Sequence, residues 1–277
     1  PESYELHQAF AQMVEAGCEY AVMEVSSQGI KMHRTDGLYF NYAIFTNISP
    51  DHIGPGEHAD FEEYLYYKTR LLNMCGIGLV NKDDKHAPQI IKAANCELCT
   101  YSEESKEADF VASDIRYVSQ PDFVGTEFHI SGKYDMEVRL GIPGLFNVVN
   151  ALAAVSVCSF LGLDQARISH ALENIRVNGR MEIVYTSERC TVLVDYAHNA
   201  VSMESLLSTL RDYKPKRLVC VFGCGGNRSK DRRYSMGEIG GKMADLSIIT
   251  ADNSRYEKVE DIIADIRGSI EKTGGKF

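Results

Sequence analysis

The sequence predicts an α/β fold built from two successive domains. Helical and strand-like hydrophobic periods alternate along the 277 residues, a turn-rich stretch at 176–180 separates two such series, and polar clusters directly follow the apolar strands. Helices that alternate with strands are typical of mainly parallel sheets. We therefore expect one domain over residues 1–178 and a second over residues 179–277.

The first domain is expected to contain a mainly parallel sheet with a β insert. Helical periods predict helices over 4–16, 60–72 and 87–94, and apolar runs predict strands over 20–25, 38–45 and 78–81. Between residues 108 and 140 the pattern is strand-like, with turn residues at Gly125 and Gly132, which predicts an antiparallel insert at the sheet edge. Two helices over 147–161 and 165–175 complete the domain.

The second domain repeats the alternation of strands and helices. Apolar runs predict strands over 190–195, 217–222 and 246–249, and helical periods predict helices over 202–213, 234–244 and 259–272. This order predicts a Rossmann-like α/β domain.

Composition limits the classes of partner. The chain has 39 acidic and 29 basic residues and a net charge of −10, so we expect no sequence-independent binding to nucleic acid. Asparagines and serines interrupt the most apolar stretch, residues 145–163, which favours a buried helix over a membrane span. Eight scattered cysteines lack the spacing of a disulfide framework and favour a reducing cytoplasm.

Polar clusters follow five of the predicted strands. They are Glu24-Val-Ser-Ser, the segment 46–52, Asp195-Tyr-Ala-His198, the loop 223–228 and Asp252-Asn-Ser-Arg255. In open α/β sheets, ligands bind outside the carboxyl ends of the strands. We therefore expect these clusters to line a cleft between the two domains, in which several ligands meet.

The loop 223–228 is a glycine-rich turn between a strand and a helix. Its backbone N–H groups could hold an anion, and four cations accompany it: Arg228, Lys230, Arg232 and Arg233. A carboxylate or phosphate ligand explains this concentration better than a solvated face does. Arg255 could likewise pair with a ligand carboxylate and Asp252 with an amine, although a purely structural turn is the alternative.

Glu24, His52 and Lys68 form a candidate metal site. Glu24 ends an apolar strand, where a carboxylate is costly unless it is paired or binds a metal. A single histidine or lysine in such a place is usually structural, but a carboxylate, an imidazole and a lysine at neighbouring strand ends favour Mg²⁺. Lysine can react with CO₂ to form a carbamate, which offers oxygen ligands. Asn147, at the start of a predicted helix, is either an N-cap or a nucleotide contact.

Seven motifs occur in the order known from one enzyme family. They are MEVSSQG (23–29), TNISPDH (46–52) with Lys68 sixteen residues after His52, GLFNVVNALAA (144–154), GRME (179–182), DYAH (195–198), FGCGGNR (222–228) and DNSR (252–255). Together they resemble the Mur ligases, and most of all the UDP-N-acetylmuramoyl-tripeptide synthetases of peptidoglycan synthesis. The resemblance covers nearly the whole chain and implies a central ATPase domain followed by a C-terminal α/β domain.

The resemblance implies an ATP-dependent amide ligase. In this family ATP phosphorylates the carboxylate of a UDP-N-acetylmuramoyl peptide, and the amine of an incoming amino acid attacks the acyl phosphate, with Mg²⁺ and arginines stabilising the negative charge. The matching positions are Glu24, His52 and Lys68 for the metal and catalysis, Ser26 and Arg34 for the UDP substrate, Asn147, Arg180, Asp195 and His198 for the nucleotide with Arg180 near the transferred phosphate, and Arg228, Asp252, Asn253 and Arg255 for the amino acid.

Two departures from the family pattern bear on activity. The sequence contains no G-x-x-G-K-[ST] loop for the ATP phosphates, so we expect a fragment that lacks this loop and the N-terminal domain and does not turn over ATP alone. Ser254 replaces the proline of the family's DNPR motif, which loosens the turn that carries Arg255. Because Arg255 suits a distal carboxylate, the amino acid is expected to be meso-diaminopimelate rather than lysine.

Two other hypotheses stay open at this point. One is a ligase of the same superfamily with another acceptor, of the folylpolyglutamate or cyanophycin type. The other is a non-catalytic binding module that keeps the fold without a phosphate loop.

Overall fold

The computed structural model describes residues 1–50, 52–54 and 56–277. The chain forms two compact units. Unit 1 comprises Pro1–Asp114, His129–Glu137 and Val148–Ile168, and unit 2 comprises Ile115–Phe128, Val138–Asn147 and Ser169–Phe277. The domain boundary that we expect near residue 178 stays a prediction.

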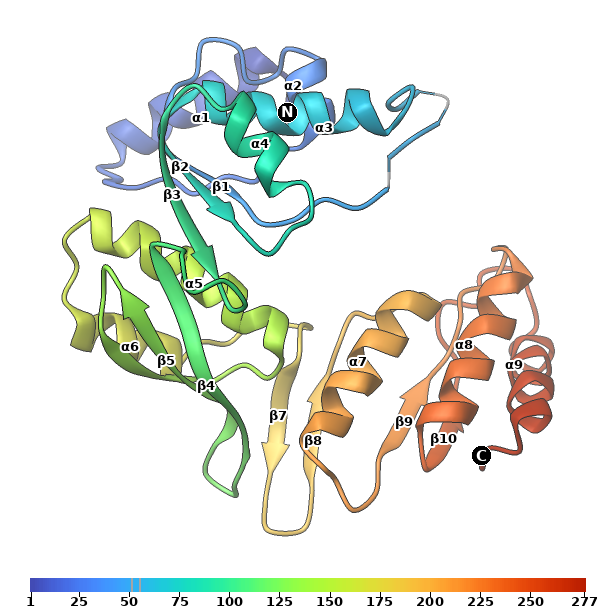
Figure 1. The fold of residues 1–277 in the computed structure, drawn as a ribbon. Helices are drawn as coiled ribbons and strands as arrows, with labels where there is room; N and C mark the ends of the chain where they lie inside the picture. Colours follow the sequence, from blue (N-terminus) through green and yellow to red (C-terminus); the bar gives the residue numbers. More distant parts are fainter. Residues whose placement is uncertain (51, 55) are drawn as a thin grey trace. The chain divides into compact units, whose positions relative to one another are not determined.

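A six-stranded sheet contains the strands of the first half of the chain (Figure 1). In spatial order they are β1 (Phe40–Phe45), β2 (Cys75–Asn81), β3 (Glu97–Ser102), β4 (Phe110–Ser119), β5 (Val124–Gly132) and β6 (Met136–Leu140). The first four strands pair in parallel. At the tight turn between β4 and β5, Gln120 and Phe123 exchange backbone hydrogen bonds, which makes these two strands antiparallel. The parallel sheet with a β insert is therefore as the sequence predicts.

The core of unit 1 lies between this sheet and two crossover helices, α3 (Phe61–Arg70) and α4 (Ala87–Ala93). Strand β2 is deeply buried in this core, since its residues Leu79 and Val80 have no exposed area. Asp60 caps α3 by accepting a hydrogen bond from the backbone N–H of Glu63 (2.8 Å). This cap fixes where α3 begins and therefore which of its side chains face the strand ends.

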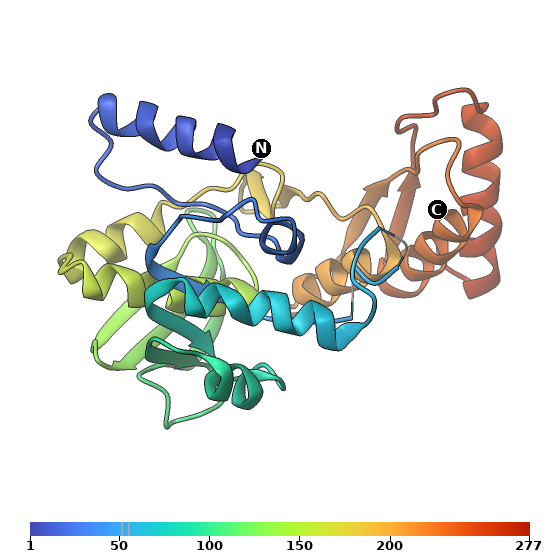
Figure 2. The same cartoon turned by 90° about the horizontal axis from the view of Figure 1, so that it is seen from above.

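The strand expected over residues 20–25 is not formed, so that prediction was wrong. A strand needs a hydrogen-bonded neighbour, and these residues pair with no strand in the part of the chain that the structure describes. Their side chains are accordingly exposed, with Tyr20 at 65% and Val22 at 101%. The sequence analysis also missed β3 and the short helix α2 (Ser27–Lys31). Helix α1 (Ser3–Glu15) buries no residue and lies at the surface of unit 1 (Figure 2).

The remaining strands form two small sheets in unit 2. Strands β7 (Glu182–Thr186) and β8 (Thr191–Val194) pair antiparallel, whereas β9 (Val219–Phe222) and β10 (Leu246–Ile249) pair in parallel. Helices α7 (Ala200–Asp212), α8 (Lys230–Met243) and α9 (Val259–Thr273) supply the apolar side chains that pack on β9 and β10. Helices α5 (Leu145–Phe160) and α6 (Gln165–Glu173) precede these sheets in the chain. The alternating strands and helices of this half are as the sequence predicts, apart from β7, which it did not predict.

Helices α8 and α9 lie side by side in both ribbon views (Figures 1 and 2). Two glycines of α8 permit this contact. A Cβ atom on Gly237 would lie 2.7 Å from the carbonyl oxygen of Ile266, and one on Gly241 would lie 2.2 Å from Oγ1 of Thr273. Any side chain at these positions would push the helices apart.

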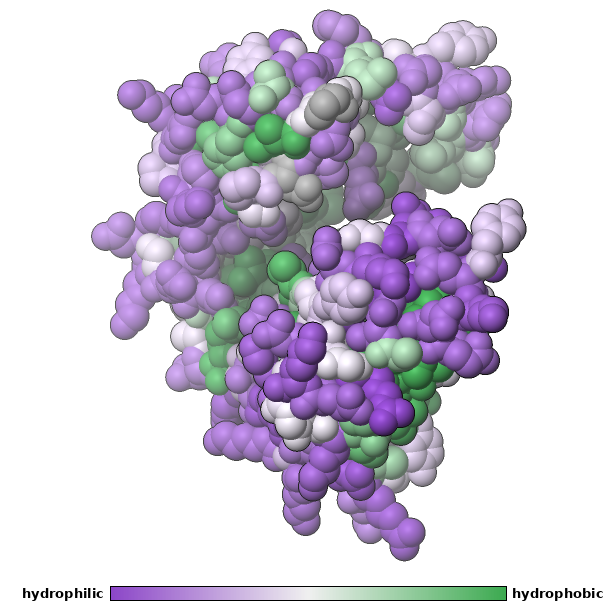
Figure 3. Space-filling view, turned by 90° about the vertical axis from the view of Figure 1, so that its right-hand side faces the viewer, coloured by the Kyte–Doolittle hydropathy of each residue, from purple (hydrophilic) through white to green (hydrophobic). Residues whose placement is uncertain are grey.

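The surface agrees with the composition. The face of the molecule in Figure 3 is mainly hydrophilic, and its hydrophobic residues form separate patches. Among the described residues, no helix combines the length and the apolar character that crossing a bilayer requires.

Tyr101→Phe should lower the free energy of unfolding by about 1–3 kcal/mol, because it leaves a buried carbonyl without its donor. The buried Tyr101 hydroxyl donates to the carbonyl oxygen of Phe45 (3.0 Å). Urea unfolding measures the change, with the exposed Tyr66→Phe as the matched control. Equal stability of the two variants would contradict the role assigned to this hydrogen bond.

Candidate functional site

Lys68 lies beside a small cavity at the carboxyl end of β1. The cavity of about 50 Å³ is lined by Lys68, by Thr46 and Asn47, which follow β1, by Val25, which precedes α2, and by other apolar side chains. Burial lowers the pKa of the Lys68 ammonium below its ordinary value, and the nearby Glu24 carboxylate partly opposes this shift. The structure thus brings Glu24 and Lys68 within electrostatic range, as the candidate metal site requires.

His52 and Lys68 both lie near the ring of Tyr64. Its imidazole packs edge-on against the Tyr64 ring at 6.0 Å between centroids, and the Lys68 ammonium lies 5.8 Å from the centroid of the same ring. His52 has a positive φ of 54°, and its Nδ1 lies 3.4 Å from a carboxylate oxygen of Glu57. Asp51, which precedes it in the TNISPDH motif, lies outside the described residues.

The joint role of Glu24, His52 and Lys68 in holding a metal ion stays a prediction. Within the described ranges, no cluster of three or more histidines, cysteines, aspartates or glutamates could hold a metal ion. Glu24 and His52 alone would supply one carboxylate and one imidazole. A third ligand would therefore have to come from another group, such as a carbamate oxygen on Lys68.

The loop that leads to His52 is held by side chains from the neighbouring strand ends. The Asn81 side-chain amide donates to the carbonyl oxygen of Thr46 (2.9 Å), and an Asp84 carboxylate oxygen accepts from the backbone N–H of Ile48 (2.8 Å). Asn81 is the last residue of β2, Asp84 follows it by three residues, and the Tyr101 hydroxyl of β3 donates to the carbonyl oxygen of Phe45, the last residue of β1. We call Asn81, Asp84 and Tyr101 the strand-end clamp.

The candidate UDP-substrate residues, Ser26 and Arg34, flank α2. The Ser26 hydroxyl caps this helix by accepting from the backbone N–H of Gly29 (2.9 Å). Arg34 pairs with Glu2 of α1 (3.0 Å). The completely buried His58 bonds through Nε2 with the hydroxyl of Ser27 (2.9 Å), so it ties the start of α2 to the segment before α3.

Three of the candidate nucleotide residues gather around the segment 195–198. One Asp195 carboxylate oxygen accepts from the backbone N–H of Met181 (2.9 Å), which follows Arg180. The Arg180 guanidinium lies over the Tyr196 ring at 4.9 Å, and His198 stacks on the same ring at 5.0 Å between centroids. The GRME and DYAH motifs therefore form one cluster, with Tyr196 at its centre.

Asn147 does not cap its helix, which corrects the simpler of its two interpretations. Helix α5 begins at Leu145, so Asn147 lies in the first turn, where its side-chain amide donates to the carbonyl oxygen of Pro143 (2.6 Å). An N-cap side chain instead accepts from the backbone. The role of Asn147 in nucleotide binding stays a prediction.

The candidate amino-acid residues occupy two loops that touch. Arg228 ends the loop after β9, and Asp252, Asn253 and Arg255 form the loop after β10. The backbone N–H of Gly226 donates to the carbonyl oxygen of Asn253 (2.8 Å). A Cβ atom on Gly226 would lie 1.9 Å from the carbonyl oxygen of Ser254, so only glycine permits this contact. The structure thus places the loops that carry Arg228 and Arg255 next to each other.

Comparison with protein families decides the classification. The model of the Mur ligase middle domain matches residues 1–158, and that of the Mur ligase glutamate ligase domain matches residues 179–275. The chain belongs to the Mur ligase family.

Several relatives share this assignment. The chain is 38% identical to the UDP-N-acetylmuramoyl-L-alanyl-D-glutamate–2,6-diaminopimelate ligase of Caldanaerobacter subterraneus subsp. tengcongensis, over 99% of this chain and 56% of that protein. It is also 38% identical to the ligase of the same name from Trichormus variabilis, over 99% of this chain and 55% of that protein. The chain therefore spans about half the length of the curated relatives it matches.

Solved structures give the same picture of the fold. A structure of a UDP-N-acetylmuramoyl-L-alanyl-D-glutamate–2,6-diaminopimelate ligase matches with a TM-score of 0.77 and 30% identity, covering 100% of this chain and 57% of that one. The folylpolyglutamate synthase of Mycobacterium tuberculosis matches with a TM-score of 0.70 and 20% identity, covering 97% of this chain and 60% of that one. The second match shows a common fold only.

Sequence reasoning missed several residues that organise this Mur ligase chain. Asn81 ends β2 and Asp84 lies in the turn after it, so the rule that selected the other polar strand ends would also have selected them. His58 gave no such signal, because its burial depends on contacts with Ser27 and with the Tyr64 and Tyr67 rings.

A second acidic group lies beside the strand-end clamp. One Asp83 carboxylate oxygen accepts from the Ser102 hydroxyl, and the other accepts from the backbone N–H of Glu103 (2.8 Å). Burial, together with the Asp83 charge, raises the pKa of the Glu103 carboxyl to about 7. A carboxyl with a raised pKa in the folded state keeps its proton to higher pH than in the unfolded state. The free energy of unfolding therefore falls as pH rises from about 4.5 to about 7.

Glu103→Gln should raise the free energy of unfolding at pH 8 by about 1–2 kcal/mol, since partial exposure screens part of the ~3 kcal/mol that the full shift represents. The gain should vanish near pH 4, where the wild-type carboxyl is protonated in both states. Urea unfolding at both pH values measures it, and Glu104→Gln is the exposed neighbouring control. A gain of the same size at pH 4 would refute the titration of Glu103 as its cause.

Proposed function

We propose that a protein with this chain and the full length of its relatives is an ATP-dependent ligase that adds meso-diaminopimelate to UDP-N-acetylmuramoyl-L-alanyl-D-glutamate. The observation that carries the proposal is the 38% identity, over 99% of the chain, to relatives that bear this name. The reaction forms an acyl phosphate from ATP and the substrate carboxylate, and the amine then displaces phosphate to give the amide. Such an enzyme of peptidoglycan synthesis would work in the cytoplasm.

Glu24, His52 and Lys68 are the residues that would hold Mg²⁺. The Lys68 amine would first react with CO₂, forming a carbamate and releasing a proton, and its burial favours the neutral amine that this reaction needs. Mg²⁺ bound there would neutralise charge on the phosphoryl oxygens. The strand-end clamp binds the backbone of Thr46 and Ile48, which follow β1.

The other candidate residues divide between the remaining ligands. Ser26 and Arg34 are proposed to contact the UDP-muramoyl peptide. Asn147, Arg180, Asp195 and His198 are proposed to contact ATP, with the Arg180 guanidinium near the transferred phosphate. Arg180, Asp195 and His198 cluster around Tyr196, which supports a common role for these three candidate ATP contacts.

The amino-acid site is assigned to Arg228, Asp252, Asn253 and Arg255. Two guanidinium groups on adjoining loops suit a ligand that carries carboxylates, and Asp252 and the Asn253 side chain suit its amine. Diaminopimelate has a distal carboxylate that lysine lacks. This difference makes Arg255 the residue expected to select between them.

Lys68→Ala should abolish amide formation by the full-length protein, because it removes the proposed carbamate ligand. Added formate or acetate should restore part of the rate by supplying an oxygen ligand. Phosphate release in the presence of all three substrates measures this effect, with the exposed Lys92→Ala as the control. Normal activity of Lys68→Ala would remove Lys68 from the mechanism.

Arg255→Ala should raise the KM for diaminopimelate by about 10–100-fold, the effect of losing one charge-assisted pair. The acceptor panel comprises diaminopimelate, lysine and glutamate, each tested with the UDP-muramoyl dipeptide. Arg189→Ala, in the exposed turn between β7 and β8, is the matched control. An unchanged KM would show that the amino-acid pocket is assigned wrongly, and use of glutamate alone would favour the folylpolyglutamate-type reaction.

A further inference from the structure

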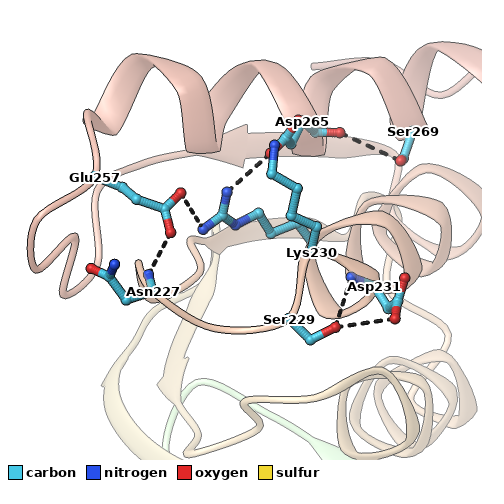
Figure 4. A network of polar contacts seen from close by, with 8 residues as sticks. Asn227, Ser229, Lys230, Asp231, Glu257, Asp265 and Ser269 are labelled. Atoms are coloured by element: carbon cyan, nitrogen blue, oxygen red, sulfur yellow. Dashed lines mark hydrogen bonds and ion pairs between the residues drawn. The ribbon is translucent and has the colours of Figure 1, made fainter.

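Arg233 is a buried cation in the first turns of α8. Only 1% of its surface is exposed. Its guanidinium donates to a carboxylate oxygen of Glu257 (2.7 Å) and to one of Asp265 (3.0 Å). Figure 4 labels the two acids. A buried charge is tolerated only when it is paired, and the guanidinium fork fixes the direction of both partners. Glu257 is therefore held in one place.

Glu257 extends this contact to the loop after β9. Its second carboxylate oxygen accepts from the backbone N–H of Asn227 (Figure 4). The side-chain oxygen of Asn227 in turn accepts from the backbone N–H of Tyr256 (3.1 Å), on the loop after β10. We call Arg233, Glu257 and Asn227 the loop brace.

Two residues of the braced loops have a left-handed backbone conformation, which most residues rarely adopt. Asn227 and Arg255 both have a φ of 51°, in the left-handed region. Asparagine tolerates this region, but for arginine it is uncommon and has an energetic cost. The Glu257 carboxylate accepts from the backbone N–H of Asn227 and so fixes the turn after β9. The Asn227 side-chain oxygen accepts from the backbone N–H of Tyr256 and so fixes the backbone directly after Arg255.

These two residues lie at the proposed amino-acid ligands: Asn227 precedes Arg228, and Arg255 is itself one of them. Arg228 follows Asn227, and Arg255 precedes Tyr256. A change in either φ would redirect the neighbouring guanidinium by several ångströms, because these long side chains start from the turn itself. The position of the two cations therefore depends on the contacts that hold the turns.

We propose that Arg233 is a positioning residue: through Glu257 and Asn227 it fixes the turns that direct Arg228 and Arg255 toward a ligand with carboxylates. Arg233 itself contacts no ligand in this arrangement, because its guanidinium is buried and engaged by the two acids. The inference rests on the proposed function only for the identity of that ligand, diaminopimelate.

Glu257→Gln tests the proposal in the full-length protein. Glutamine offers one oxygen and one NH₂ group in place of two oxygens, so an NH₂ donor would face either the Arg233 guanidinium or the Asn227 backbone N–H, and that hydrogen bond would be lost. The backbone amides of Asn227 and Tyr256 should exchange hydrogen at least about tenfold faster, as expected when a local contact opens. The KM for diaminopimelate should rise about tenfold, the scale of one lost charge-assisted bond, while the KM for ATP stays unchanged.

Glu271→Gln is the matched control. Glu271 makes an exposed pair with Arg267 on α9 (2.8 Å), away from both loops. This variant should change neither the exchange of the Asn227 and Tyr256 amides nor the KM for diaminopimelate.

Asn227→Ala keeps the proposal testable if Glu257→Gln loosens the whole α8–α9 pair. It removes the bond to Tyr256 while leaving the Arg233 pairs with Glu257 and Asp265 in place. Faster exchange at Tyr256 and a higher KM for diaminopimelate would support the proposal. Unchanged exchange at Tyr256 in both variants, or an unchanged KM despite faster exchange, would overturn it.

The hydrogen-exchange measurement separates this proposal from the proposed function. If the wild-type protein does not use diaminopimelate at all, the proposed function fails. The exchange rates of Asn227 and Tyr256 still decide whether the loop brace holds the two turns.

Discussion

The carboxyl end of a parallel strand leaves backbone groups without ladder partners, and polar side chains from neighbouring elements supply those partners in this protein. After β1, the strand-end clamp of Asn81, Asp84 and Tyr101 binds the backbone of residues 45–48. After β9 and β10, Glu257 and Asn227 bind the backbone of the opposite loop. The candidate ligand residues lie just beyond these bonds, so their positions depend on them.

The strand-end clamp and the loop brace both supply partners for unpaired backbone groups, but burying their side chains costs different amounts of free energy. The clamp uses an amide, a carboxylate and a hydroxyl, and the Tyr101 hydroxyl needs only one acceptor to be satisfied. The loop brace depends instead on a buried guanidinium, whose desolvation must be offset by Glu257 and Asp265 together. Ionic pairing of this kind is directional, which suits loops that carry strained residues such as Arg255.

Much of the fold follows from local sequence patterns. Strands β1, β2, β8, β9 and β10 and helices α3, α5, α8 and α9 follow from their hydrophobic periods, and polar residues at strand ends identified part of the candidate site. The segment 20–25 has the same apolar pattern as a strand yet pairs with none among the described residues, because pairing depends on a neighbour that a local pattern does not specify. His58, Asn81 and Glu257 escaped notice for a similar reason. Their roles come from partners 31, 35 and 30 residues away in the chain.

The glycine contact between α8 and α9 links the two loops that carry Arg228 and Arg255. Gly237 and Gly241 let one helix rest on the backbone of the other, so no flexible side chain can absorb a displacement between them. The loop after β9 runs into α8, and the loop after β10 runs into α9. Both loops are therefore attached to one closely packed helix pair, so the spacing of the two turns depends on the contact between α8 and α9 as well as on the residues within the loops.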